Sequence, residues 1–297
     1  VGGFQSFAGE NAIEEMTSTG LNFACVASPD DRHFDSCKRL LEAGTHLIVE
    51  KPSVLKLQEL DELVALAEKN NVTAKVVYHK LFDPDHKKMR TLVYDNILKH
   101  VNSGYCSLLE PKAISGKQFA QWITGRNPGT YVAVHYIKLI AFDIHTSWVT
   151  PDNFPGYVEQ EVSFRFDNGL WNGHSRKRGV ECTVEEKTPF ELKNSMNNHF
   201  NATFIEPWNE RSQRGYGIEV IEQFAKEVAE IEFGGPESER QARLEKIRSL
   251  GYNDLSADRQ TVATVQALEA ILEHQAAGDP DCVVRVNDEK GGLVLYR

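Results

Sequence analysis

The sequence lacks the features that mark membrane proteins and nucleic-acid binders. No run of about 18 consecutive apolar residues occurs, and a membrane-spanning helix requires one. Basic residues are in the minority, because 33 Lys and Arg stand against 43 Asp and Glu and give a formal net charge of −10. A nucleic-acid binder carries a basic surface instead. We therefore expect neither a nucleic acid nor a membrane among the partners of this protein.

Cysteine is also scarce. The 5 cysteines show no metal-type spacing, and their odd number excludes a complete disulfide framework. A reducing compartment accounts for this usage, so we predict a cytoplasmic protein without a bound metal. The chain has 297 residues, of which 41% are hydrophobic and 26% charged. These values indicate about two domains of ordinary globular composition.

The first organised feature is a β-α-β-α-β pattern. Short apolar runs at 21–29, 46–50 and 74–78 predict strands, because parallel strands that are buried on both faces are continuously apolar. Apolar residues at helical spacing predict helices over 32–43 and 56–70. This order predicts a parallel α/β sheet with right-handed crossovers.

The pattern changes after residue 84. In chain order, we predict a helix (85–101), a strand (103–112), an antiparallel hairpin (158–175), a helix (217–232), a polar surface excursion (234–250) and a closing helix (256–275). The hairpin prediction depends on Asn168-Gly169, a strong turn signal between two strand-like runs. The second half is therefore predicted to be an α+β domain with a mainly antiparallel, open-faced sheet.

Polar residues follow two of the predicted parallel strands. Ser28-Pro29 ends the first strand, with His33 shortly after it, and Glu50-Lys51-Pro52 ends the second. In an open parallel sheet, ligands bind in the crevice beyond the carboxyl ends of the strands. Each segment also suits a plain turn, because proline cannot continue a central strand. The residue types alone leave both interpretations open.

Residues 24–53 read, in order, as a strand ending in Ser-Pro, a His four residues on, a helix ending in Ala-Gly, a strand, and Glu-Lys-Pro. This order is similar to the second half of the nucleotide domain in the Gfo/Idh/MocA oxidoreductases, the family of glucose–fructose oxidoreductase and inositol dehydrogenase. The combined spacing is far more specific than any single piece. Three later segments also resemble the family, so that the likeness covers nearly the whole chain: 78–84, 122–135 and 214–216.

The resemblance implies a Rossmann-like dinucleotide-binding domain followed by a substrate domain. We expect residues 1–84 to form part of the first, with closing helices returning from the C-terminus. Residues 85–297 are expected to form the second, which binds substrate and mediates oligomerisation. The family further implies NAD or NADP as cofactor, a small-molecule substrate, and a homo-oligomer (dimer or tetramer) assembled through the open face of the second sheet.

The reaction implied by the resemblance is hydride transfer between nicotinamide and a secondary alcohol carbon of a sugar, cyclitol or related polyol. His135 is the candidate base for the hydroxyl proton, since histidine ordinarily titrates near neutral pH. Lys51 is the candidate donor to the reacting oxygen, and Tyr131 is the third candidate catalytic group. The other implied roles are cofactor binding for Ser28, Pro29, His33, Glu50, Lys51, Pro52, Trp122 and Arg126, and substrate binding for Lys51, His79, Lys80 and His135. A plain alternative is a core histidine on an apolar helix for His135 and a solvated strand-end lysine for Lys51.

Two departures from the family pattern bear on this activity. The Gly-rich loop G-x-G-x-x-G does not occur in residues 1–30, so we expect the chain to lack the first β-α-β portion of the nucleotide domain. NAD and NADP stay undistinguished, because the residue that reads the 2′ position lies in that portion. Tyr131 and Lys138 stand where the family often has Asp near its catalytic His, so His135 lacks a carboxylate there and is expected to be a weaker base.

Two other functions stay open at this point. A non-catalytic binding or regulatory relative would keep the fold, and both the missing Gly-rich loop and Tyr131 favour it. A reductase or dehydrogenase of a non-sugar substrate such as a dihydrodiol is the other, and only a substrate screen separates it from a sugar dehydrogenase.

Overall fold

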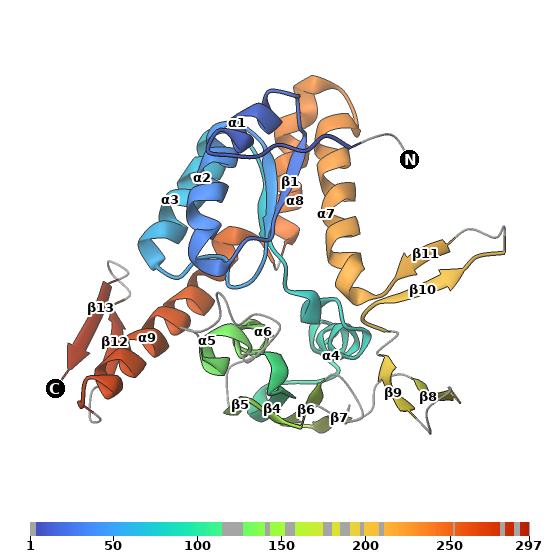
Figure 1. Cartoon of the computed structure of the whole chain (residues 1–297), viewed down its shortest axis with the longest axis vertical. Coiled ribbons are helices and arrows are strands. Elements are labelled where there is room, and N and C mark those ends of the chain that lie inside the picture. Colours follow the sequence, from blue (N-terminus) through green and yellow to red (C-terminus); the bar gives the residue numbers. More distant parts are fainter. Residues whose placement is uncertain are drawn as a thin grey trace. The chain divides into compact units, whose positions relative to one another are not determined.

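The chain forms two compact units (Figure 1). Unit 1 comprises residues 1–77 and 221–297, and unit 2 comprises residues 78–220. The structure, a computed structural model, describes residues 4–114, 127–139, 143–151, 158–174, 180–184, 191–196, 199–207, 211–251, 253–279, 283–287 and 292–296.

Three parallel strands form the sheet of unit 1, in the order β1-β2-β3. The N-terminal elements are, in chain order, α1 (Ala12–Thr17), β1 (Phe23–Val26), α2 (His33–Glu42), β2 (His46–Val49), α3 (Leu57–Lys69) and β3 (Ala74–Val76). The C-terminal elements are α7 (Tyr216–Phe233, in this unit from residue 221), α8 (Arg240–Leu250), α9 (Arg259–Ala276), β12 (Val283–Asn287) and β13 (Gly292–Tyr296). The predicted β-α-β-α-β order and the Rossmann-like parallel sheet are confirmed.

The two faces of this sheet differ in chemistry. Side chains alternate along a strand, so the face toward α2 and α3 carries only apolar residues: Ala24, Val26, Leu47, Val49, Ala74 and Val76. The opposite face lies against α7, where the rings of Phe23 and Phe224 meet at 5.7 Å between centroids. That face also carries His46 and Lys75, which are almost fully buried. Buried polar groups need partners, and α7 supplies them.

His46 illustrates how this polar face is satisfied. The Thr73 backbone N–H donates to His46 Nδ1 at 2.9 Å, so the ring proton is on Nε2, which donates to Glu232 Oε1 at 2.7 Å. Arg240 bonds the same carboxylate at 2.6 Å. Burial lowers the pKa of His46, and the hydrogen bond to Glu232 opposes that shift in part. The ring is therefore held in one neutral tautomer.

Residues 234–250 were predicted to be a polar surface excursion, and most of them are exposed, but the helix within them was not predicted. They contain α8, whose Leu244 and Ile247 form a buried cluster with Ile231 of α7. Arg243 extends the anchoring, because its guanidinium donates to the backbone carbonyl of Ile231 at 2.9 Å. Only two positions of α8 are buried among many charged ones, which is why the segment carries so weak an apolar pattern.

Unit 2 is built on a mixed four-stranded sheet in the order β5-β4-β6-β7. Its elements are the 3₁₀ turn η2 (His79–Leu81), α4 (Pro84–Tyr94), β4 (Val101–Pro111), α5 (Pro128–Tyr131), α6 (Val134–Leu139), β5 (Asp143–Thr150), β6 (Glu159–Phe166), β7 (Gly169–His174), β8 (Val180–Val184), β9 (Glu191–Met196), β10 (Ala202–Ile205) and β11 (Arg211–Arg214). The β6–β7 hairpin confirms the antiparallel prediction, whereas β4 and β5 pair in parallel.

The core of unit 2 lies on one face of this sheet. Eight buried side chains from α4, the α5–α6 segment and the two strands β4 and β6 pack together there: Met89, Cys106, Leu108, Val132, Tyr136, Val162, Phe164 and Phe166. The helix predicted over 85–101 is wrong in its second half, since α4 ends at Tyr94. Asn96 follows with a φ of +57°, a left-handed conformation that ends a helix. The packing of the α5–α6 segment on this core fixes the backbone around His135.

Candidate active site

The predicted polar residues of unit 1 gather at the carboxyl edge of its sheet. β1 and β2 are parallel and pair Val26 with Val49, so the segments that follow both strands leave the sheet at the same edge. Ser28 follows β1, and Lys51 follows β2. The backbone N–H of Lys51 donates to Glu50 Oε2 at 3.1 Å, which places this carboxylate against its own strand end.

His33 links these two segments. Its side chain is 1% exposed, and its ring nitrogens face two backbone carbonyls: Nδ1 lies 2.9 Å from the oxygen of Pro52 and Nε2 lies 2.8 Å from that of Ser28. A buried ring in this position ties together the loops that follow β1 and β2. Its predicted direct contact with a cofactor stays a prediction.

Residues that the sequence analysis did not identify form further hydrogen bonds to the loop after β2. Ser53 Oγ donates to Asp258 Oδ2 at 2.6 Å, and both side chains are fully buried. The backbone N–H of Leu57 donates to Gln266 Oε1 at 3.0 Å, which satisfies one open donor at the start of α3. The loop after β2 is thus anchored to the C-terminal helical segment. More than 200 residues separate these partners, so no local pattern marks them.

The Ser28 hydroxyl bears on cofactor binding. Its Oγ is buried and has no hydrogen-bond partner among the residues that the structure describes. A buried hydroxyl without a partner is costly unless a ligand group meets it. The strand ends therefore fit one polar edge of a dinucleotide. The sequence contains no G-x-G-x-x-G that would cradle the pyrophosphate.

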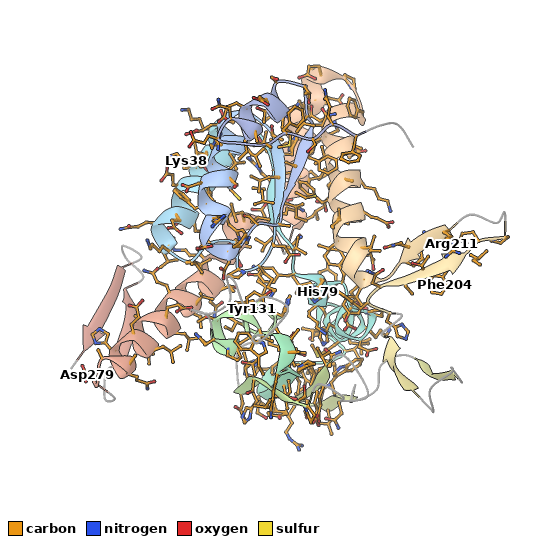
Figure 2. All side chains as sticks on the ribbon, viewed as in Figure 1. Lys38, His79, Tyr131, Phe204, Arg211 and Asp279 are labelled. Atoms are coloured by element: carbon orange, nitrogen blue, oxygen red, sulfur yellow. The ribbon has the colours of Figure 1, made fainter. Side chains whose placement is uncertain are left out.

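The predicted base, His135, lies in unit 2 on α6. Its side chain is 3% exposed, and its ring packs against two residues of the 78–84 segment. The centroid distances are 4.2 Å to His79 and 6.2 Å to Tyr78, both in edge-on arrangements. The structure therefore brings the two predicted substrate-side histidines together. Figure 2 labels His79 within this unit.

Lys80 is the third predicted residue of this group, and its side chain is also buried. The ammonium donates to the side-chain oxygen of Gln160 and lies 3.4 Å from the Tyr216 hydroxyl. His86 Nδ1 lies 3.0 Å from the backbone carbonyl of Lys80 and helps to hold the turn. Gln160 was missed at the sequence level, because a glutamine on an alternating strand carries no signal of its own.

Tyr216 reaches this group because of the glycine before it. Gly215 has a φ of +128°, and a Cβ there would lie 2.3 Å from the backbone oxygen of Phe200. Only glycine permits this approach at the start of α7. In the sequence, the only indication of a role for Tyr216 was the Arg214-Gly215-Tyr216 segment, which resembles the family pattern.

Tyr131, predicted to act beside His135, has its ring 6.3 Å from that of Trp148 and packs against the hydrophobic core of unit 2. Its catalytic role stays a prediction. Trp122 and Arg126, predicted near the cofactor, lie outside the described residues.

Two cysteines in the described part of the chain, Cys37 and Cys106, are buried. Burial raises the pKa of both Cys37 and Cys106 to about 12, so neither is a thiolate near neutral pH. Within the described ranges, no three or more His, Cys, Asp or Glu side chains are grouped as a metal site would require. In the same ranges, none of the helices combines the length and hydropathy of a membrane span.

Comparison with known proteins addresses the family. Residues 4–78 match the model of the Gfo/Idh/MocA family, described as an oxidoreductase family with an NAD-binding Rossmann fold. The resemblance seen in residues 24–53 is confirmed by this match.

Individual relatives match parts of the chain. The uncharacterized oxidoreductase YfiI of Bacillus subtilis is 30% identical over 114 residues, which are 36% of this chain and 29% of that protein. The scyllo-inositol 2-dehydrogenase (NADP(+)) IolW of the same organism is 24% identical over 31% of this chain and 26% of its own length. The matched part of the chain thus spans less than a third of either relative.

Solved structures extend the likeness to the whole fold. An inositol dehydrogenase homolog from Azotobacter vinelandii, solved with NADH and myo-inositol, aligns with a TM-score of 0.58 and 16% identity. The alignment covers 96% of this chain and 81% of that chain. At this identity the likeness shows the fold.

Proposed function

We propose, from the match of residues 4–78 to the model of the Gfo/Idh/MocA oxidoreductase family, that this chain belongs to an NAD(P)-dependent dehydrogenase. Its substrate class is a secondary alcohol in a sugar, cyclitol or related polyol. The family match and the names of two relatives, an inositol dehydrogenase homolog and a scyllo-inositol 2-dehydrogenase, support this class. The observation that carries the proposal is the pair of tied strand ends, Ser28-Pro29 and Glu50-Lys51-Pro52, at the carboxyl edge of the matched sheet.

A bound nicotinamide dinucleotide supplies the hydride acceptor. The residues of unit 1 that would hold it are Ser28, through its buried hydroxyl, and the segment of Glu50 and Lys51. His33 holds both segments in place through the carbonyls of Ser28 and Pro52. These residues do not themselves form a Gly-rich phosphate-binding turn.

The alcohol loses a proton as well as a hydride, so a base and a donor to the oxygen are required. We assign the base to His135, which is buried among aromatic rings of unit 2. Lys51 is assigned as the donor to the reacting oxygen. Lys80, whose ammonium is held by Gln160 and Tyr216, is assigned to bind substrate hydroxyl groups.

A substrate screen tests this proposal in the protein as its gene encodes it. Polyols, inositols and sugars are offered with NAD or NADP, and NAD(P)H absorbance is followed. The Lys51→Ala and His135→Asn variants should lose activity by about 10²- to 10⁴-fold, the usual contribution of a positioned acid or base. Lys56→Ala, a strand-loop lysine whose side chain is 65% exposed, is the matched control and should keep it.

Unchanged turnover in Lys51→Ala would refute the assigned role of that residue. A non-catalytic binding relative is the second candidate, since no G-x-G-x-x-G occurs in this sequence. NAD(P)H fluorescence titration separates the two. Absence of NAD(P)H binding would favour the non-catalytic candidate. Turnover only on a non-sugar carbonyl or dihydrodiol would replace the substrate class.

A further inference from the structure

Two imidazole rings lie in contact in unit 2. The rings of His79 and His135 are 4.2 Å apart between centroids, with an interplanar angle of 61°. His135 comes from α6, whereas His79 opens η2 directly after unit 1. The contact therefore joins segments that are far apart in sequence, and it is formed by the fold.

The two rings differ in their access to solvent. His135 is buried at 3% exposure, and the ring of Tyr78 covers one side of it. His79 is half-buried and packs against Phe200 and Tyr216, at 5.1 Å and 6.0 Å between centroids. His79 is thus the outer ring of the pair, and His135 is the inner one.

The charges around the pair set its protonation. Titratable groups on the elements around the pair include Tyr78, Lys80, Asp83, His86, Tyr136, Lys138, His199 and Tyr216. The Lys138 ammonium lies 5.8 Å from the centre of the Tyr78 ring, and the Lys80 ammonium lies 5.6 Å from that of Tyr216. Both lysines thus lie against tyrosines whose rings contact the histidine pair. Nearby positive charge disfavours a doubly protonated pair, because like charges repel. The Asp83 carboxylate has the opposite charge and would favour protonation of the pair. Its Oδ1 accepts a hydrogen bond from the backbone N–H of Asp85 at the start of α4.

We propose that His79 and His135 form a relay in which His79 passes to solvent the proton that His135 receives. This inference rests on the proposed function for its catalytic part. During oxidation the substrate O–H bond breaks and an N–H bond forms on His135. The substrate C–H bond breaks as well, and its hydrogen and electron pair go to the nicotinamide acceptor, leaving a carbonyl. The proton then moves from His135 to His79 and on to water, so that atoms and charge balance. His79 acts through His135 and not on the substrate carbon.

A relay predicts coupled titration of the two rings. In the protein without substrate, the imidazole signals of His79 and His135 are followed by NMR against pH, with each ring assigned from its variant. Replacing His79 by Phe keeps an aromatic ring in the packing but removes the second ionisable group. We expect the midpoint of His135 to rise by about one pH unit in His79→Phe, since the repelling neighbour is gone. His79→Gln, polar and uncharged, should give a shift of the same sign.

His145→Phe is the matched control. His145 is exposed on β5, its ring lies 5.2 Å from that of Tyr105, and its partner is Asp143. His145→Phe should not change the midpoint of the His135 titration. A His135 midpoint that stays within about 0.2 pH unit in both His79 variants would overturn the coupling. A His135 that shows no titration in any variant would overturn it equally.

The kinetic arm tests the relay step. In His79→Phe, kcat of alcohol oxidation should fall by about 10-fold or more with KM little changed, and the pH–rate profile should move with the His135 midpoint. Added imidazole buffer should restore part of kcat, because a soluble base can take the proton at the outer position. If His79→Phe instead changes KM alone, and imidazole buffer does not restore activity, His79 has only a packing role and the relay is refuted. Coupled titration without turnover on any alcohol would refute the proposed function while leaving the coupling of the two rings intact.

Discussion

Removing the carboxylate of Glu227 should destabilise unit 1 strongly. Glu227 pairs with Lys75 across the polar face of the sheet, with Nζ and Oε2 at 2.6 Å, although the angles fall outside those of a good hydrogen bond. The lysine side chain is 1% exposed and the glutamate 18%. A Cβ on Gly251 would lie 2.7 Å from the ammonium, so this space is closed on that side too. The ammonium therefore depends on Glu227 in place of water.

The magnitude follows from this asymmetry. Breaking a buried pair by removing one partner costs about 3–5 kcal/mol, because the other charge stays buried. Glu227 retains some contact with water, so we expect the lower end, about 3 kcal/mol, for Glu227→Gln. Lys75→Met should cost less, about 1 kcal/mol, since the remaining carboxylate can turn to solvent and the methionine fills the space. The double variant Lys75→Met with Glu227→Leu should be near the original stability.

Urea unfolding followed by circular dichroism measures these differences. The surface pair Lys38–Glu62 is the matched control, because it has the same 2.6 Å contact in the same unit but exposures of 38% and 45% (Lys38 is labelled in Figure 2). Glu62→Gln should change the free energy of unfolding by less than about 1 kcal/mol. A Glu227→Gln variant as stable as Glu62→Gln would refute the claim that burial decides the effect.

Three shorter predictions concern other positions. Burial lowers the pKa of His46 in the folded state, so stability should be lost as pH falls below about 6.5, the pKa of an unfolded histidine. The urea midpoint should fall over this pH range in the original protein and should change less in His46→Asn. Gly215→Ala should cost more than about 2 kcal/mol, because φ is +128° and the new Cβ meets the Phe200 backbone; an unchanged thermal midpoint would contradict this. Ser53→Ala removes a donor from the buried Asp258 carboxylate and should cost about 1–3 kcal/mol in the same unfolding assay, where equal stability would show that the bond is dispensable.

Local patterns were sufficient where an element is buried on one consistent face. The strands of unit 1 are short and apolar, and α2 and α3 repeat apolar residues at helical spacing. The pattern failed for α8, in which only Leu244 and Ile247 are buried. It also failed beyond Tyr94, where Asn96 ends the helix by its conformation and not by a break in hydropathy.

The site was predictable in its parts and not in its contacts. The strand-end residues could be named because the carboxyl edge of a parallel sheet follows from the order of its elements. The bond from Ser53 to Asp258 and the contact of His79 with His135 could not, because the chain places those residues 205 and 56 positions apart. Short-range spacing carries no information about partners at such separations.

The sequence by itself determined the parallel sheet, the family resemblance and the residue types at the strand ends, since each depends on neighbours within a few positions. Only the tertiary structure decided which polar groups are buried and what satisfies them. In the sequence, Lys75 is a single charged residue in an apolar strand. It can be buried there because Glu227 of α7, which is distant in sequence, pairs with it. Burial and long-range pairing are properties of the folded chain, because the free energy of a buried charge depends on partners that the sequence alone does not place.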